Sequence, residues 1–156
     1  MNFEKTGDIM KAIVYVCFLF LLIIQPAFAF ETDRIGHIQT LKGSASISRV
    51  NLTLPAAIKG TINRGDLVRT SKDSSIGIVM LDDTTLSLGP SSEIIIRDYA
   101  FVPKEGKFTF LVRMAKGTFS YIAGLIGKLS PNSIQLEIPD ATIAVRGTKL
   151  LVEVQE

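Results

Sequence analysis

The sequence predicts an all-β protein, a single compact domain of many short antiparallel strands and hairpins. Three observations support this prediction. Apolar and polar residues alternate in short runs, turn-forming residues separate the runs, and no helical periodicity exceeds two turns after residue 30. Residues 134–138, for example, read Ile-Gln-Leu-Glu-Ile, the period of two that is typical of a half-buried strand. A β-sandwich or roll, or a short solenoid-like stack, would bury one face of each strand.

Further strands are predicted wherever the same alternation returns. They cover residues 45–47, 94–96, 107–112, 141–145 and 149–154. Turn residues punctuate them at Gly65-Asp66, Gly89-Pro90, Pro131-Asn132 and Pro139-Asp140. No linker or low-complexity tract interrupts the pattern, so we expect one domain over residues 35–154.

Residues 121–129 are the strongest helical candidate in this region. Gly124 and Gly127 weaken that interpretation, so we expect a glycine-rich hairpin connection instead. Four apolar residues lie between or beside the glycines: Ile122, Leu125, Ile126 and Leu129. They form either a loop that covers the core or an exposed apolar patch for a partner.

Asp82-Asp83 separates two strand-like runs, residues 76–81 and 84–88. Two residues between strands favour a tight primed turn, which needs positive φ at its central positions. We expect both carboxylates to be solvated; the alternative is that they supply oxygen ligands to Ca²⁺, which needs six or more. Gly77, inside the first run, suggests a bulge or a close backbone approach.

Composition excludes several classes of function. Seventeen Lys and Arg against fifteen Asp and Glu give a net charge of +2, too small a bias for a nucleic-acid binder. One histidine and one cysteine cannot make a His/Cys zinc site. Any serine or cysteine hydrolase would have to use His37, which we interpret as a surface or strand histidine. We therefore expect no enzyme and no cofactor; the alternative is carboxylate chemistry or ligand binding at Asp66, Asp82, Asp83 and Asp140.

The N-terminus has the marks of a secretory signal peptide. Lys11 precedes an uncharged apolar run over residues 12–24, and the small residues Ala27 and Ala29 follow it. The pattern predicts a signal peptide over residues 1–29, cleaved before Phe30, and a periplasmic or secreted product. A retained anchor is the alternative, but the run is shorter than the roughly 20 residues of a membrane span. Cys17 lies within the run rather than at its end, which does not support lipid attachment.

Several stretches together resemble the FecR domain, a periplasmic module of bacterial iron-transport signalling regulators. Gly65-Asp66-x-Val68-x-Thr70 is similar to one family segment, and Gly117-Thr118-Phe119-Ser120-Tyr121 to another. The strongest element is Pro139-Asp140-Ala141 leading into Arg146-Gly147-Thr148. The resemblance covers residues 35–154. Asp82-Asp83 departs from the Asp-Gly that the family usually has at that turn.

The resemblance implies an exported, non-catalytic binding or interaction module of the bacterial envelope, linked to signalling or transport. The alternative is a structural envelope protein that binds a small ligand or the cell wall. In the signalling regulators, the domain lies between a cytoplasmic anti-sigma segment and a portion that contacts an outer-membrane transporter. Eleven residues before the apolar run and eight after Thr148 are too few for either, so we expect a free-standing FecR domain whose partner is another envelope protein.

The resemblance also selects the residues of interest: Gly65, Asp66, Pro139, Ala141, Arg146, Gly147 and Thr148. We expect Asp66 to bind backbone N–H groups in a turn. Arg146 is expected to pair with a buried acid such as Asp66 or Asp83; alternatively, it binds a carboxylate or phosphate of a partner. Gly147 would let the chain bend into the last strand. Six other basic residues are interpreted as solvated: Lys42, Arg49, Lys59, Arg64, Arg69 and Lys72.

Overall fold

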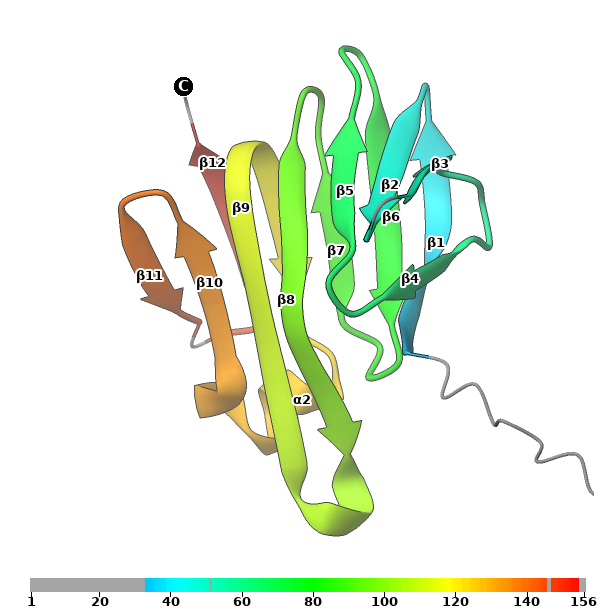
Figure 1. Ribbon diagram of the computed structural model, residues 1–156. Helices are drawn as coiled ribbons and strands as arrows, with labels where there is room; N and C mark the ends of the chain where they lie inside the picture. The colour runs from blue at the N-terminus through cyan, green and yellow to red at the C-terminus, as the bar shows by residue number, and fades with distance from the viewer. Residues whose placement is uncertain (1–32, 51, 146, 155–156) are drawn as a thin grey trace, which may run out of the picture. The chain divides into compact units, whose positions relative to one another are not determined.

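The computed structural model describes residues 33–50, 52–145 and 147–154, and within them the all-β prediction is confirmed. The predicted signal peptide and Arg146 lie outside the described residues. The described residues belong to one unit, Thr32–Glu156. Its strands join into a single curled sheet (Figure 1).

The elements follow one another with short connections. The first six strands are β1 (Arg34–Lys42), β2 (Ala45–Arg49), β3 (Leu52–Pro55), β4 (Thr61–Asn63), β5 (Leu67–Thr70) and β6 (Ser75–Met80). The next three are β7 (Thr85–Leu88), β8 (Glu93–Val102) and β9 (Lys107–Ile122), with the 3-10 turn η1 (Pro103–Glu105) between the last two. Helix α2 (Leu125–Leu129) and η2 (Pro131–Ser133) precede β10 (Ile134–Ile138), β11 (Ala141–Ala144) and β12 (Lys149–Val154).

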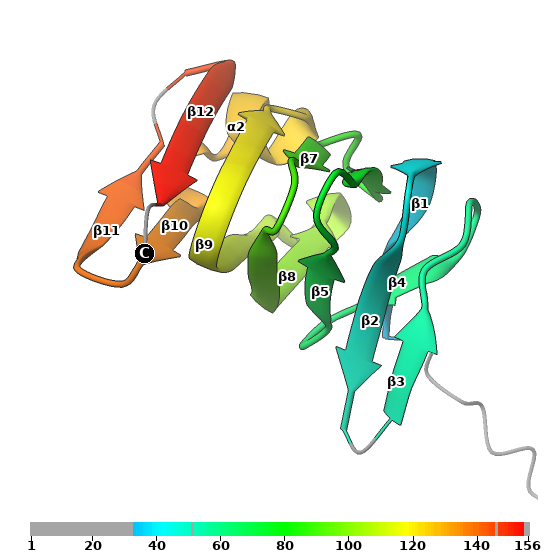
Figure 2. The same ribbon diagram turned by 90° about the horizontal axis from the view of Figure 1, so that it is seen from above.

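The long strand β9 joins the two halves of the sheet. Its first part pairs with β8 and β10, whereas its last part, from Gly117 to Ile122, pairs with β7 and β12. Beyond β8 the order is β5, β2 and β3; beyond β7 it is β6, β1 and β4. Figure 2 shows these two halves as facing layers. Sequence-distant strands are thereby brought to opposite sides of one core.

Gly117 is the point where β9 passes from one half to the other. Its φ of 89° is in the left-handed region, and an added Cβ would clash with Ser92. The Ser92 hydroxyl accepts a hydrogen bond from the Thr118 N–H at 2.9 Å and fastens this bend. A strand with this bend can belong to both layers.

Alternate residues of the strands build the core, as the period of two predicts. Ile76, Ile78 and Met80 of β6 are buried, and so are Phe119 and Tyr121 of β9. Phe110 links two tyrosines: its ring centroid lies 6.2 Å from that of Tyr99 and 5.5 Å from that of Tyr121. One contiguous core therefore serves both layers.

The expected glycine-rich hairpin connection after Tyr121 is wrong. Residues Leu125–Leu129 form a short α-helix, and the strand that follows, β10, runs parallel to β9. A parallel neighbour needs a crossover connection, which the helix supplies. Gly127 is tolerated in it because its bare Cα faces the Ala123 side chain and the Tyr121 hydroxyl, which a Cβ would crowd.

The predicted hairpin at Asp82-Asp83 is present, but its loop has three residues instead of two. Met80 donates to the Thr84 carbonyl at 2.9 Å, and Asp83 donates to the Met80 carbonyl at 3.1 Å. Of the two aspartates only Asp83 has a positive φ, 63°. This is the pattern of a turn followed by one left-handed residue. Gly77 is confirmed as a close approach, because a Cβ there would meet Thr40 opposite a register shift in β1.

Candidate functional site

The first polar cluster of the fold is centred on Asp82, whose side chain is fully buried. One carboxylate oxygen accepts from the Tyr99 hydroxyl at 3.0 Å and the other from the Thr84 hydroxyl at 2.7 Å. The Ile126 N–H donates to the carboxylate at 3.1 Å, and the Asp82 carbonyl accepts from the Leu125 N–H at 2.7 Å. The carboxylate thus joins the hairpin turn to β8 and to the start of α2.

This geometry corrects the expectation of a solvated Asp82. Only Asp83 is exposed; Asp82 points inward, because the turn places Asp83 at its outer corner. The Asp82 oxygens are occupied by protein donors, so the interpretation as a Ca²⁺ ligand has no support from this arrangement. Within the described ranges, no three His, Cys, Asp or Glu side chains come together as a metal site would require.

Two tyrosines beside Asp82 are held in their protonated form. Burial, and after it the Asp82 carboxylate, raises the pKa of Tyr99 far above its usual value. The same two causes raise the pKa of Tyr121 to about 12. The Tyr121 hydroxyl is buried without a hydrogen-bond partner in the described structure. The Thr84 hydroxyl beside it is already committed, because it donates to Asp82 and accepts from the Gly124 N–H at 3.1 Å.

Asp66 forms the second buried charge cluster, and its partner is Arg49. The Arg49 guanidinium donates to the two Asp66 oxygens at 2.8 and 3.0 Å and to the Thr61 carbonyl at 2.7 Å. Asp66 also accepts from the Asn63 N–H at 2.8 Å, as a turn aspartate does. The interpretation of Arg49 as a solvated residue is therefore wrong, since it neutralises a carboxylate that is 1% exposed.

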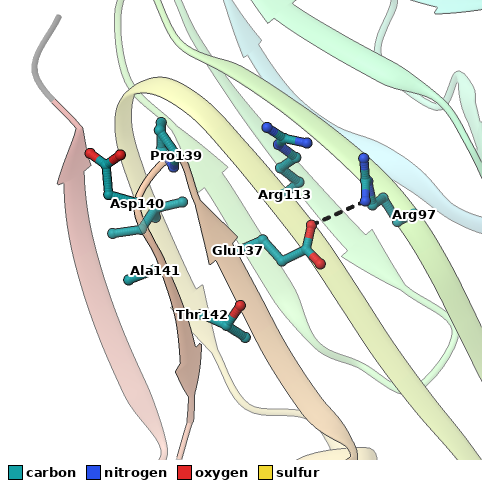
Figure 3. A pocket seen from close by; sticks show the side chains of 8 residues that line it. Arg97, Arg113, Glu137, Pro139, Asp140, Ala141 and Thr142 are labelled. Atoms are coloured by element: carbon teal, nitrogen blue, oxygen red, sulfur yellow. Dashed lines mark ion pairs between the residues drawn. The ribbon is translucent and has the colours of Figure 1, made fainter.

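The surface feature closest to the family signature is a groove of about 430 Å³ at the β10–β11 hairpin. We call it the signature groove; it is lined by Arg97, Arg113, Glu137, Ile138, Pro139, Asp140, Ala141 and Thr142. Figure 3 shows the two arginines on the same side of the sheet as Glu137 and the hairpin turn. Two of the signature residues, Pro139 and Ala141, are thus brought together with three charged side chains that the sequence did not single out.

Backbone geometry places those three charges. In the parallel pairing of β9 and β10, Arg113 lies opposite Glu137. Arg97 is the extra residue of a bulge in β8, between Ile96 opposite Val112 and Asp98 opposite Leu111. A bulge re-aims the side chain it inserts, and here it turns Arg97 toward Glu137, 3.3 Å away.

The signature groove is lined by two arginines, Arg97 and Arg113, and two carboxylates, Glu137 and Asp140, but only one ion pair forms among them. Glu137 forms its ion pair with Arg97, whereas Arg113 makes no ion pair or hydrogen bond with any residue that the structure describes. A half-buried guanidinium with free donors can bind a carboxylate or phosphate through two parallel hydrogen bonds. Arg113 is therefore the position in this groove that can receive an anionic group.

A second hollow, of about 280 Å³, lies beside Arg69, Ser91, Glu93 and Lys116. Its arginine is already paired, because the Arg69 Nε donates to Glu93 at 2.7 Å. An anionic ligand would therefore find a less available guanidinium in this hollow than in the signature groove.

The remaining sequence-selected residues do not gather at one site. Gly65 has φ 84° in the turn before β5, and Gly147 has φ 154° with open space around it. Thr148 is exposed just before β12, and His37 is partly buried in β1. The apolar group around α2 is divided: Ile126 is fully buried, whereas Ile122, Leu125 and Leu129 are exposed. Ile126 is therefore part of the core, and the other three side chains are exposed; a partner for these three stays a prediction.

Together, the sheet and its groove describe an all-β domain with a surface suited to binding. The family model of the FecR protein matches residues 66–156, more than half of the chain. The chain therefore belongs to the FecR family, which is known for regulatory and signalling domains of the bacterial envelope rather than for enzymes. No curated protein and no solved structure matches it. Within the described residues, no helix has the length and apolar character to cross a membrane.

Proposed function

We propose that this protein is an exported, non-catalytic binding module of the bacterial envelope, linked to signalling or transport. It binds an anionic segment of another envelope protein in the signature groove. Export is inferred from the predicted signal peptide at residues 1–29, and the envelope context from the family.

The observation that carries the binding proposal is the state of Arg113. Its neighbour Arg97 forms an ion pair with Glu137, whereas Arg113 forms no ion pair or hydrogen bond with any described residue, although Glu137 and Asp140 line the same groove. The groove wall is formed by the pairing of β8, β9 and β10, so the backbone that carries Arg113 has a fixed position before a ligand arrives. A fixed backbone reduces the ordering cost of binding to that of the arginine side chain itself.

The two largest buried charge clusters support a non-catalytic function. Asp82 and Asp66 are both saturated by protein donors, and neither lines the groove. A general acid or base must reach the proton that it transfers. The carboxylates that the sequence offered for catalysis are therefore used to hold the fold, apart from the exposed Asp83 and Asp140.

The experiment is cross-linked capture from the periplasm with three forms of the full chain. We expect the wild type to capture a specific envelope protein, Arg113→Glu to lose it, and Lys72→Glu to retain it. Lys72 is exposed in the turn before β6, so its variant changes the net charge equally without touching the groove. Equal capture by all three forms would refute the groove as the binding site.

The alternative, a small anionic ligand or cell-wall component, predicts a different result from the same variants. The volume of the signature groove, about 430 Å³, is within the range of about 300–1,000 Å³ for ligand pockets. Such pockets are usually more enclosed and more apolar than this groove. In that case a soluble cell-wall fragment would protect the wild type but not Arg113→Glu against thermal unfolding, and capture of protein would be unaffected.

A further inference from the structure

The strand β12 occupies one end of the sheet and has a free edge. In the described structure it pairs only with β9, from Lys149 opposite Ile122 to Val154 opposite Gly117. Figure 2 shows it at the margin of its layer, with β11 at the margin of the other. An edge of this kind exposes a row of backbone donors and acceptors that can pair with another strand.

The register determines which residues face that free edge. The Thr148 carbonyl accepts from the Ala123 N–H at 2.9 Å, so Thr148 points its carbonyl toward β9. Because the direction alternates along an antiparallel ladder, Leu150, Val152 and Val154 also bond to β9. The backbone groups of Lys149, Leu151 and Glu153 therefore point outward.

The outward row is self-complementary. If a second copy of β12 pairs antiparallel with Leu151 opposite Leu151 of the other copy, Lys149 of each copy lies opposite Glu153 of the other. Leu151, 68% exposed in the single chain, then packs on its own copy at the centre. Opposite charges and apolar pairs in directly opposed positions stabilise a sheet, whereas shifted registers lose these matches.

The inner face of β12 supports the same arrangement. Leu150, Val152 and Val154 pack against the core but remain partly exposed, as expected where a layer ends early. A further strand beside β12 would cover them. Thus both faces of this edge gain apolar contact from the same addition.

We propose that this chain forms a twofold-symmetric dimer by pairing β12 with β12 of a second copy, in register about Leu151. The pairing is isologous, as a twofold axis perpendicular to the sheet requires. Three opposed positions exchange backbone hydrogen bonds, at Lys149 with Glu153, Leu151 with Leu151, and Glu153 with Lys149. One pair of strands buries less than a standard interface, so the dimer is concentration-dependent.

Site-directed cross-linking tests the register. In the purified full chain with Cys17→Ser, Leu151→Cys should form an intermolecular disulfide under mild oxidation. Hydrogen-bonded opposed residues have Cα atoms about 5.5 Å apart, within the roughly 4.4–6.8 Å that a disulfide spans. Glu153→Cys is the matched control and should not cross-link to itself, because its two copies are four residues out of step. Cross-linking at 153 and not at 151 would overturn the proposal.

Sedimentation equilibrium with charge reversal tests the interface itself. Lys149→Glu places carboxylates opposite each other and should weaken dimerisation by roughly tenfold or more. Adding Glu153→Lys to the same chain restores opposite charges and should restore the dimer, whereas Lys72→Glu should leave it unchanged. A wild type that stays monomeric at all concentrations, or a double reversal that fails to recover while remaining folded, would refute the proposal.

Discussion

Tyr99 and Asp82 exchange two hydrogen bonds across the core. The Tyr99 hydroxyl accepts from the Asp82 N–H at 3.0 Å and donates to the Asp82 carboxylate at 3.0 Å. Tyr99 comes from β8 and Asp82 from the turn between β6 and β7, so the pair joins the two layers. Thr84 donates to the Asp82 carboxylate from both its N–H and its hydroxyl. The Gly124 N–H donates to the Thr84 hydroxyl and the Ile126 N–H to the Asp82 carboxylate, which extends the connection to α2.

We expect Asp82→Ala to destabilise the fold severely. The substitution leaves the Tyr99 and Thr84 hydroxyls and the Ile126 N–H buried without an acceptor, at about 1–3 kcal/mol for each unsatisfied group. Urea unfolding should therefore show a loss of roughly 3 kcal/mol or more in the free energy of unfolding. The exposed neighbour gives the control: Asp83→Asn should change stability by at most about 0.5 kcal/mol. Equal effects at both positions would contradict the role of Asp82 as the centre of this cluster.

Stability should fall at alkaline pH through the two buried tyrosines. Their pKa values are raised in the folded protein, for Tyr121 to about 12, from about 10 in the unfolded chain. Below pH 10 both states hold the tyrosine protons, so this stabilisation is complete; it is lost as the pH rises from about 10 through 12. Unfolding measured across this range should track the tyrosinate absorbance. Tyr121→Phe should reduce the slope without lowering stability at neutral pH, because the hydroxyl has no hydrogen-bond partner.

Arg49→Ala should destabilise far more than its partly exposed position suggests. It leaves the buried Asp66 carboxylate without its guanidinium, and breaking such a pair costs about 3–5 kcal/mol when fully buried, with less expected here because Arg49 is 27% exposed. Arg64→Ala is the control, since its bond to Asp33 at 3.0 Å joins two exposed side chains and contributes about 0–1 kcal/mol. Thermal melts of the two variants should differ clearly.

Gly124→Ala should be poorly tolerated for a steric reason alone. The φ of Gly124 is −92°, which any residue adopts, but an added Cβ would clash with the backbone of Asp82, Asp83 and Thr84. Gly65→Ala provides the contrast, because its φ of 84° is strained and its surroundings are open. We expect a cost of about 1–2 kcal/mol at Gly65 and a larger loss of melting temperature at Gly124. The reverse order would show that α2 can move away from the hairpin turn.

Expression of the full chain in a bacterium tests the predicted leader. The small residues Ala27 and Ala29 predict cleavage before Phe30, so intact-mass measurement of the periplasmic protein should give an N-terminus at Phe30. Ala29→Leu should block processing, because signal peptidase accepts only small residues there. An uncut wild-type chain in the membrane fraction would favour the retained anchor.

The local sequence pattern determined the strands, the class and the family. Alternation of apolar and polar residues is a property of neighbouring positions, so 134–138 and 149–154 could be predicted as strands without knowing their partners. The FecR signature was recognisable for the same reason, since each of its motifs is a short contiguous stretch. The helix at Leu125–Leu129 was not predicted, because five residues carry too little helical periodicity to outweigh Gly124 and Gly127.

Tertiary structure alone decided the partners of the charges. Arg49 meets Asp66 across 17 positions, Asp82 meets Ile126 across 44, and Arg113 faces Glu137 through a parallel pairing. Adjacent aspartates are chemically identical in the sequence, yet the turn buries Asp82 and exposes Asp83. Burial and pairing depend on register between distant strands, and a shift of one residue would turn every such side chain to the opposite face.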